Sequence, residues 1–382
     1  MREPEVVIAG CGVISAVGCG VEPLRAALQN NVSGLRASEK FNTSRFQSSI
    51  VGAAPRNNDD DPAWFLAAEA LQQARTAAGG MLAGIPAART GLVLSTTKAN
   101  IEALERVAAN RPCSEAARRH LRADLLAVDL AAAHGAGGPV QAVSVACVSG
   151  LVAIAQGAKL IQRGEADAVL VVGVDCLSEF VVAGFTALKA LDPQGCRPFD
   201  RDRCGLSPGE AGAAVVLLRA DGFSQPAIAI RAFGGSNDAN HLTGPSRDGS
   251  GLAQAIYTAL GAAKLSPAEI DFVHAHGTGT SYNDAMESLA LKRVFGETCP
   301  PVAGAKGMLG HTLGAAGVIE TIGCTLAMQH GFLPGTPGLS HAADGAPPGL
   351  VREPRAVVRL KNVLKLNTGF GGMNGALILS HA

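Results

Sequence analysis

The sequence is poor in aromatic side chains and has no excess of either charge. Aromatic residues make up 4% of the 382 positions, with one Trp and two Tyr. The 32 basic residues balance the 32 acidic ones, and no basic stretch stands out. We therefore expect no nucleic-acid partner, because nucleic-acid binding needs concentrated positive charge.

The chain also lacks the segments by which membrane and secreted proteins are recognised. The apolar run AVLVVGV at 168–174 is too short to span a bilayer. The opening MREPEVVIAG has neither the apolar core of a signal peptide nor the composition of a transit peptide. We expect no membrane partner and a cytoplasmic location.

Two common chemical motifs are missing as well. The nine cysteines are scattered without a C-x-x-C, which argues against a zinc ribbon, a redox pair and, in a cytosolic chain, disulfides. Most of these thiols are expected to be small core fillers. The run VVIAGCGVIS at 6–15 imitates a dinucleotide fingerprint, but Ser15 replaces its third glycine and no acidic residue follows at the required distance.

Small and aliphatic residues dominate instead, with 47% hydrophobic residues and 47 glycines. Apolar runs that suit strands occur at 5–9, 91–96, 140–146, 167–174, 212–219, 226–233, 270–275, 301–305, 362–367 and 375–380. Helical spacing of apolar residues occurs at 63–78, 149–163, 250–264 and 314–330. Several strand-like runs are apolar on both faces, which is typical of strands between helix layers, so the pattern predicts an α/β fold.

Two segments of the chain resemble one another. Residues 140–161 and 301–326 each read as a buried strand, a turn with a reactive residue type and a helix rich in Gly and Ala. This similarity predicts two related halves, 1–222 and 223–382, each presenting a helix N-terminus to a shared centre.

The first candidate for chemistry is Cys147, in the stretch SVACVSGLVAI. It stands where a strand-like run turns into a helix-like run. A helix N-terminus favours the thiolate, and its free N–H groups can hold an oxyanion. The alternative is a packed core cysteine.

A second candidate is the stretch FVHAHGTGT at 272–280. His276 suits a general base or a donor to a carbonyl, and Thr278 and Thr280 offer hydroxyls to a polar ligand. Because alternate residues of a strand share a face, His274 and His276 are also a possible metal pair. No third ligand has an evident spacing, so we expect no metal.

A third candidate is the glycine-rich turn around Lys306 and His311. Glu320 follows on the next predicted helix. A lysine in such apolar surroundings needs a carboxylate partner or a function, although a solvated surface lysine is the alternative.

The fourth candidate is the loop LNTGFGGMNGA at 366–376, where Phe370 stands between Gly369 and Gly371. A lone aromatic on a mobile glycine loop suits a lid or gate, and the glycines let backbone N–H groups face a site. The alternative is a turn whose phenylalanine fills the core.

A thiol, two histidines, a lysine and a glycine loop together suit acyl-thioester chemistry. At this point the chain resembles the elongating β-ketoacyl-[acyl-carrier-protein] synthases, the condensing enzymes of fatty-acid and polyketide synthesis. The likeness runs over nearly the whole length, in the family's order, through VVIAGCGVISAVG, FNTSRF, SVACVSGLVAIAQGAKLI, RPFDRDRCGLSPGEAG, VHAHGTGTSYNDAMES, GAKGMLGHTLGAAGVIE and NTGFGGMNGALIL.

The resemblance implies the thiolase fold, in which two duplicated α/β halves stack as a five-layered α-β-α-β-α sandwich, and an obligate dimer. It implies that Cys147 takes the acyl chain as a thioester, with the N–H groups of Cys147 and Phe370 as its oxyanion hole. His276 and His311 would promote decarboxylation of malonyl-carrier protein. Lys306, paired with Glu320, would tune the His311 region.

The resemblance further implies that Thr278 and Thr280 touch the phosphopantetheine arm and that Phe370 is the gate, flanked by the substrate loop of Gly369 and Gly371. Val148, where the family often has a small polar residue, would narrow or reshape the acyl entrance. Arg203 would either contact an acidic carrier or form a structural salt bridge.

The implied partners are acyl carrier protein and either a second copy of the chain or a related ketosynthase or chain-length-factor subunit. No cofactor is implied beyond the phosphopantetheine of the carrier. Departures such as Met373 in GFGGMN favour polyketide or polyene-type secondary metabolism over housekeeping fatty-acid synthesis. Two alternatives stay open: a non-condensing chain-length-factor-like subunit and a coenzyme A-dependent thiolase.

Overall fold

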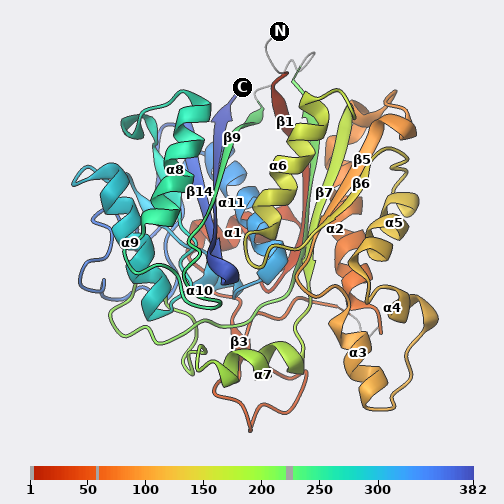
Figure 1. The fold of residues 1–382 in the computed structure, drawn as a ribbon, viewed down its shortest axis with the longest axis horizontal. Coiled ribbons are helices and arrows are strands. Elements are labelled where there is room, and N and C mark those ends of the chain that lie inside the picture. The colour runs from red at the N-terminus through yellow and green to blue at the C-terminus, as the bar shows by residue number, and fades with distance from the viewer. Residues whose placement is uncertain (1–3, 57–59, 221–226) are drawn as a thin grey trace.

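The computed structural model describes residues 4–56, 60–220 and 227–382 (Figure 1). The strands are β1 Val6–Ser15, β2 Gly18–Cys19, β3 Arg36–Ala37, β4 Ile50–Val51, β5 Thr90–Ser95, β6 Val140–Val143, β7 Ala168–Asp175, β8 Ala211–Arg219, β9 Ile228–Asn237, β10 Phe272–His274, β11 Val302–Ala303, β12 Phe332–Leu333, β13 Arg355–Ala356, β14 Asn362–Gly369 and β15 Met373–His381. The helices are α1 Val21–Asn30, α2 Pro62–Ala78, α3 Ile101–Ala108, α4 Glu115–Arg119, α5 Ala123–Ala133, α6 Ser149–Gln162, α7 Glu179–Ala187, α8 Ser250–Ala263, α9 Ser281–Phe295, α10 Lys306–Leu309 and α11 Ala316–His330.

The same strand order occurs twice. One half of the large sheet runs β6-β5-β7-β8-β1 and the other runs β11-β10-β14-β15-β9. In both halves the first three strands of this order pair in parallel and the last two pair antiparallel. Matching order and direction confirm the expected duplication. The predicted division between residues 222 and 223 lies outside the described residues.

The two half-sheets meet at one edge, where β1 pairs with β9 through two residues of each strand. Between them lie α6 and α11, visible in the middle of Figure 1. Every residue of α11 from Ala316 to Met328 is buried, as is typical of a helix covered on all sides. With α2 and α5 outside one half-sheet and α8 and α9 outside the other, the molecule has the five layers of the thiolase fold.

Glycines let the central helices touch. A Cβ on Gly150 of α6 would come within 2.7 Å of Val318 N, and a Cβ on Gly317 of α11 within 2.4 Å of Leu151 N. Gly10 and Gly12 of β1 do the same for α2, since a Cβ on either would clash with its backbone, at 2.2 Å from Ala74 O and 2.0 Å from Ala70 O. The glycines of the run that imitates a dinucleotide fingerprint therefore serve helix packing.

The elements expected from the sequence are present, and several others were not predicted. The strand expected at 140–146 ends at Val143, where the chain enters a turn. The unpredicted helices include α3, α7 and α9, which carry charged residues among their apolar ones. All nine cysteines are free thiols. Within the described ranges, no helix is both long and apolar enough to cross a membrane.

Candidate active site

Cys147 lies in the tight turn between β6 and α6. Ala146, just before it, has φ 46°, a left-handed conformation that is uncommon for a residue with a Cβ. Ser149 holds this turn closed, because its Oγ donates to Ala146 O at 2.6 Å and accepts from Val145 N at 2.8 Å. The turn therefore fixes the thiol at the N-terminal end of α6, one of the two central helices.

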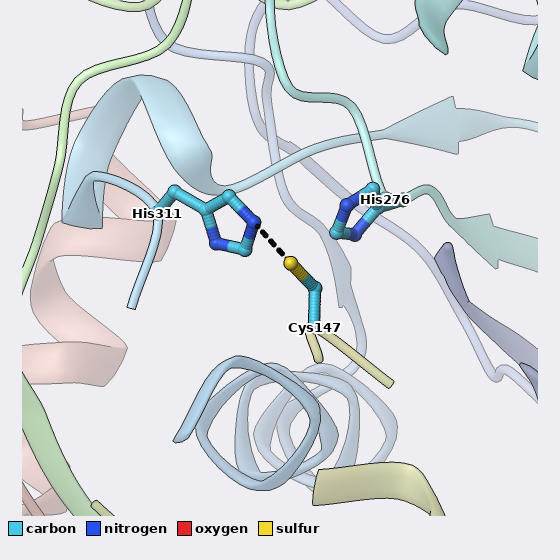
Figure 2. A group of neighbouring side chains, drawn as sticks. All are labelled: Cys147, His276 and His311. Atoms are coloured by element: carbon cyan, nitrogen blue, oxygen red, sulfur yellow. Dashed lines mark hydrogen bonds between the residues drawn. The ribbon is translucent and has the colours of Figure 1, made fainter. Parts of the chain in front are cut away.

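Two imidazole rings face this thiol (Figure 2). His311 Nε2 lies 3.0 Å from Cys147 Sγ. The sulfur and one nitrogen each of His276 and His311 lie within 4.8 Å of one another. The two rings meet edge to face, with centroids 5.3 Å apart. The fold thus brings together three residues that are far apart in the sequence.

His311 follows α10 and is held through both its backbone and its ring. Its N–H donates to Ser207 O at 2.7 Å, and its Nδ1 accepts the Leu313 N–H at 3.2 Å. Because Nδ1 is an acceptor, the proton of the neutral ring lies on Nε2 and points at the sulfur. Burial, aided by the charge of Lys306, lowers the pKa of His311 to about 3, so the ring is uncharged at neutral pH.

His276 follows β10, and the buried carboxylate of Glu287 on α9 holds its loop. Glu287 accepts the N–H groups of His276 and Gly277 at 2.6 and 2.9 Å. The His276 Nδ1 lies 2.9 Å from Asn367 Nδ2 and 3.2 Å from Lys306 Nζ, two donors, so Nε2 again carries the proton. Burial lowers the pKa of His276 well below its ordinary value.

Behind the histidines lies a fully buried lysine–glutamate cluster of Lys306, Glu320 and Lys365. Lys306 Nζ lies 2.6 Å from Glu320 Oε1, and Lys365 Nζ lies 2.8 Å from Oε2. Lys306 also donates to His276 O at 2.6 Å. Burial alone would raise the pKa of Glu320, but the two ammonium groups hold it far below its usual range. The predicted Lys306–Glu320 partnership is present, and Lys365 is an addition.

The charge state of Cys147 differs from the sequence-based expectation. A helix N-terminus was expected to favour the thiolate, but burial raises the pKa of Cys147 to about 11. The positive charges of Lys306 and Lys98 and the Phe370 N–H oppose this shift only in part. The free thiol is therefore protonated at neutral pH, because enclosure outweighs the helix terminus.

The glycine loop comes close to the thiol on another side. The backbone N–H of Phe370 hydrogen-bonds Cys147 Sγ, and a Cβ on Gly369 would lie 3.1 Å from Cys147 N. Gly371 has φ 82°, which favours glycine. Phe370 is 40% exposed, and its ring lies against that of Phe185 of α7, with ring centroids 6.2 Å apart. The phenylalanine is thus a surface residue beside the site rather than a core filler.

The two threonines lie on the loop after His276. Thr278 and Thr280 share a hydrogen bond of 2.8 Å between their hydroxyls. Asp284 of α9 accepts the N–H groups of Thr278 and Gly279 at 3.0 and 3.2 Å and so fixes this loop. Arg203 lies 3.5 Å from Asp284 and is 12% exposed, which favours a structural salt bridge over a carrier contact.

Val148 is fully buried at the start of α6. Its methyl groups face two glycines, since a Cβ on Gly369 or Gly375 would lie 3.3 or 2.7 Å from a Val148 carbon. The valine therefore packs the turn against β14 and β15, and a role in shaping the acyl entrance stays a prediction.

The hydrogen bonds at the histidines oppose metal binding. Of the described residues, one group of three potential ligands has metal-like spacing, namely Cys147, His276 and His311. A metal at Nε2 would need its proton removed, yet Nδ1 of each ring already faces a donor. His274 is not in this group; its Nδ1 bonds Ala275 O at 3.1 Å.

Sequence reasoning missed three charged residues of the site: Lys365, Glu287 and Asp284. A lysine inside the apolar run NVLKLN was the available signal for Lys365. Asp284 and Glu287 stand three residues apart in the first turns after the histidine loop, a spacing that puts both carboxylates on one helix face.

Models of one known protein family match most of the chain. Residues 36–222 match the β-ketoacyl synthase N-terminal domain and residues 228–340 match its C-terminal domain. The chain is 33% identical to the tetracenomycin polyketide synthase ketoacyl synthase alpha subunit of Streptomyces glaucescens, over 99% of this chain and 97% of that one. It is 32% identical to 3-oxoacyl-[acyl-carrier-protein] synthase 2 of Vibrio cholerae, over 99% of both.

Solved structures show the same fold. A chain of the ishigamide ketosynthase/chain length factor superposes with a TM-score of 0.93 at 31% identity over the full length of both chains. The ketosynthase ApeO in complex with its chain length factor ApeC from Xenorhabdus doucetiae gives 0.88 at 29% identity, over 99% and 98% of the two chains.

Fold and site together define an acyltransferase of the thiolase superfamily. The chain belongs to the β-ketoacyl synthase family.

Proposed function

We propose that this chain is a β-ketoacyl-[acyl-carrier-protein] synthase, which joins an acyl group held on Cys147 to a malonyl unit by decarboxylative condensation. The observation that carries the proposal is the convergence on one thiol. Two uncharged imidazoles, His276 and His311, and the backbone N–H of Phe370 surround Cys147 Sγ.

In the first half-reaction, Cys147 Sγ attacks the thioester carbonyl of an acyl-carrier protein. A new C–S bond forms, the bond to the phosphopantetheine sulfur breaks, and the thiol proton leaves with the departing thiol. The N–H groups of Cys147 and Phe370 stabilise the oxyanion. Because burial keeps the thiol protonated, its proton is available to the leaving sulfur.

In the second half-reaction, a malonyl thioester loses CO₂ and the electron pair of the broken C–C bond moves toward the thioester oxygen. His276 and His311 donate their Nε2–H groups to that oxygen. The enolate carbon then attacks the acyl carbonyl on Cys147, the C–S bond breaks, and the thiolate regains a proton from water. All electrons come from the broken C–C bond, so the reaction needs no metal or redox cofactor.

The remaining predicted residues bind the substrate, control access to Cys147 or orient His276. The hydroxyls of Thr278 and Thr280 hydrogen-bond the phosphopantetheine arm. Phe370, with Gly369 and Gly371 beside it, gates access to Cys147. Lys306 and Glu320 hold His276 in the tautomer that donates.

The proposed partners are an acyl carrier protein and a second subunit, either a copy of this chain or a chain-length-factor-like relative. The Streptomyces, ishigamide and Xenorhabdus relatives favour polyketide-type synthesis over housekeeping fatty-acid synthesis, and a cytoplasmic location is part of the proposal. The presence of Cys147 argues against a non-condensing subunit. The single cysteine of the described site argues against a thiolase, which uses two.

Intact-protein mass spectrometry tests the acyl acceptor. With octanoyl-carrier protein as the probe, the wild type is expected to gain one octanoyl group and Cys147→Ser none. Cys204→Ser, which removes an exposed thiol, is the control and should acylate like the wild type. Acylation that persists in Cys147→Ser, or that maps to another cysteine, overturns the proposal.

A further inference from the structure

Lys365 is a fully buried lysine to which the proposed reaction gives no role. It lies on β14 and is 0% exposed. An ammonium ion at this depth is costly unless it is paired and hydrogen-bonded. Its partners are Glu320 Oε2 at 2.8 Å and the carbonyl oxygens of Leu366 and Ala275.

Two lysines divide the carboxylate of Glu320 between them. Lys306 Nζ lies 2.6 Å from Oε1 and Lys365 Nζ lies 2.8 Å from Oε2. The last torsion of a glutamate has a broad energy minimum, so one lysine alone would leave the carboxylate free to turn. Two lysines on opposite oxygens fix its orientation.

The orientation of the Glu320 carboxylate affects His276 through two residues that contact both. Lys306, on Oε1, also donates to His276 O at 2.6 Å and lies 3.2 Å from Nδ1. Asn367 Nδ2 lies 2.9 Å from His276 Nδ1 and 3.3 Å from Glu320 Oε2. Without Lys365, Oε2 would lose its closest partner and draw the Asn367 amide away from the imidazole.

We propose that Lys365 is a positioning residue of the active site. By occupying Glu320 Oε2, it keeps Lys306 and Asn367 against His276 Nδ1 and so holds the ring in its Nε2–H form. This inference rests on the proposed function for its effect on rate, but its effect on His276 is independent of any reaction.

The positive charge of Lys365 also favours hydrogen-bond donation by the imidazoles, because it keeps them uncharged. The lysine–glutamate cluster carries two ammonium groups and one carboxylate, which leaves one positive charge in excess beside His276 and His311. The positive charge of Lys365 adds to the burial that keeps both imidazoles uncharged. Uncharged rings donate a hydrogen bond to the thioester oxygen without binding the malonyl carboxylate as an ion pair.

The variants are Lys365→Met, which keeps the length and removes the charge, and Lys365→Arg, which keeps the charge. Lys361→Met, an exposed lysine just before the same strand, is the matched control. The probe is malonyl-N-acetylcysteamine, and CO₂ release is measured. We expect kcat of Lys365→Met to fall about 10- to 100-fold with KM within about threefold, as for lost supporting hydrogen bonds elsewhere.

Lys365→Arg is expected to recover most of that loss, and the alkylation rate of Cys147 with iodoacetamide to stay unchanged, which reports an intact site. In a His276→Ala background, Lys365→Met should cost little more, because the lysine acts through this ring. The inference is overturned if Lys365→Met keeps the wild-type kcat, or if kcat and the alkylation rate of Cys147 fall together. It is also overturned if Lys365→Met lowers kcat by the same factor in the His276→Ala background as in the wild type.

Histidine ring NMR of the substrate-free protein separates the two proposals. Lys365→Met is expected to move the His276 signal and to leave that of the distant His120 in place. If the wild type releases no CO₂ but the His276 signal moves, the proposed reaction fails and the positioning role stands. If CO₂ is released and the signal does not move, the positioning role is wrong.

Discussion

Two buried histidine environments in this chain surround the same side chain with opposite charges. His276 and His311 face cations and N–H donors, whereas His120 lies between two carboxylates. His120 Nδ1 is 2.5 Å from Asp61 Oδ2, and its Nε2 is 3.0 Å from Asp129 Oδ2. The ring also stacks on Trp64, with ring centroids 5.2 Å apart and planes 7° from parallel.

Burial alone does not decide the charge of a histidine. Burial lowers the pKa at all three rings. At His120 the hydrogen bonds to Asp61 and Asp129 outweigh burial and raise the pKa above its ordinary value. Among the described residues, no carboxylate hydrogen-bonds the rings of His276 and His311, so burial keeps them uncharged. Asp61 and Asp129 instead favour the imidazolium form of His120, and these three residues form the His120 clamp.

The two environments also differ in purpose. Asp61 caps α2 by accepting the Trp64 N–H at 3.3 Å, His120 follows α4, and Asp129 lies on α5. The clamp thus joins three helices on one side of the molecule (Figure 1). Its hydrogen bonds between charged groups join structural elements, whereas the proposed mechanism needs uncharged rings beside a buried positive cluster.

The largest expected effect follows from removing the only carboxylate of the lysine–glutamate cluster. Glu320→Ala leaves Lys306 and Lys365 buried without their anion, and breaking such a group typically costs about 3–5 kcal/mol. Denaturant unfolding should show this loss. Glu297→Ala, at an exposed glutamate, should stay within about 0.5 kcal/mol. Equal stability of the two variants would mean that the Glu320 carboxylate does not stabilise the two buried lysines.

His276→Ala is expected to lower the rate of malonyl decarboxylation by about 10²- to 10³-fold, because it removes one donor to the developing oxyanion. Acylation of Cys147 should persist, since the thiol and the Phe370 N–H are untouched. CO₂ release and intact-protein mass spectrometry measure the two steps, and the exposed His330→Ala is the control. Normal decarboxylation in His276→Ala would remove this ring from the proposed mechanism.

His120→Phe keeps the stacking on Trp64 but removes both hydrogen bonds to carboxylates. The expected loss is about 1–3 kcal/mol in the free energy of unfolding, as for a buried polar group left without its hydrogen-bond partner. A raised pKa in the folded state stabilises most below the unfolded value of about 6.5 and stops contributing as pH rises through the folded pKa. The difference from wild type should therefore narrow at alkaline pH, with His341→Phe, at an exposed position, as control.

The smallest effect is spectroscopic. Trp64 is the only tryptophan of the chain, so its fluorescence reports on the stacked His120 ring. As the imidazolium loses its proton, we expect fluorescence to rise with a midpoint above pH 6.5, because the carboxylates raise the pKa of His120. His120→Phe should abolish the transition. A midpoint below pH 6.5 would mean that burial dominates at this ring as it does at His311.

Sequence patterns predicted most of the core and the residue types of the site. The candidate residues follow apolar strands, in turns that hydrophobic periodicity and glycines make recognisable in the sequence. They are Cys147, His276, Lys306, His311 and Phe370. The unpredicted helices, such as α3 and α9, mix charged with apolar residues, which obscures the apolar period. Some of these charges are buried against other elements, as Glu287 is against the His276 loop. The His120 clamp left no local trace, since its carboxylates come from other helices.

The sequence by itself predicted the strands and helices of the core, the repeat of two halves, and the thiol and imidazoles that we propose carry the chemistry. These depend on local spacing and on motifs within a few residues. Only the tertiary structure decided the tautomers of His276 and His311, the protonated state of Cys147, and the place of Lys365 on Glu320. Each of these depends on burial and on partners from distant elements, because electrostatic effects act through space rather than along the chain.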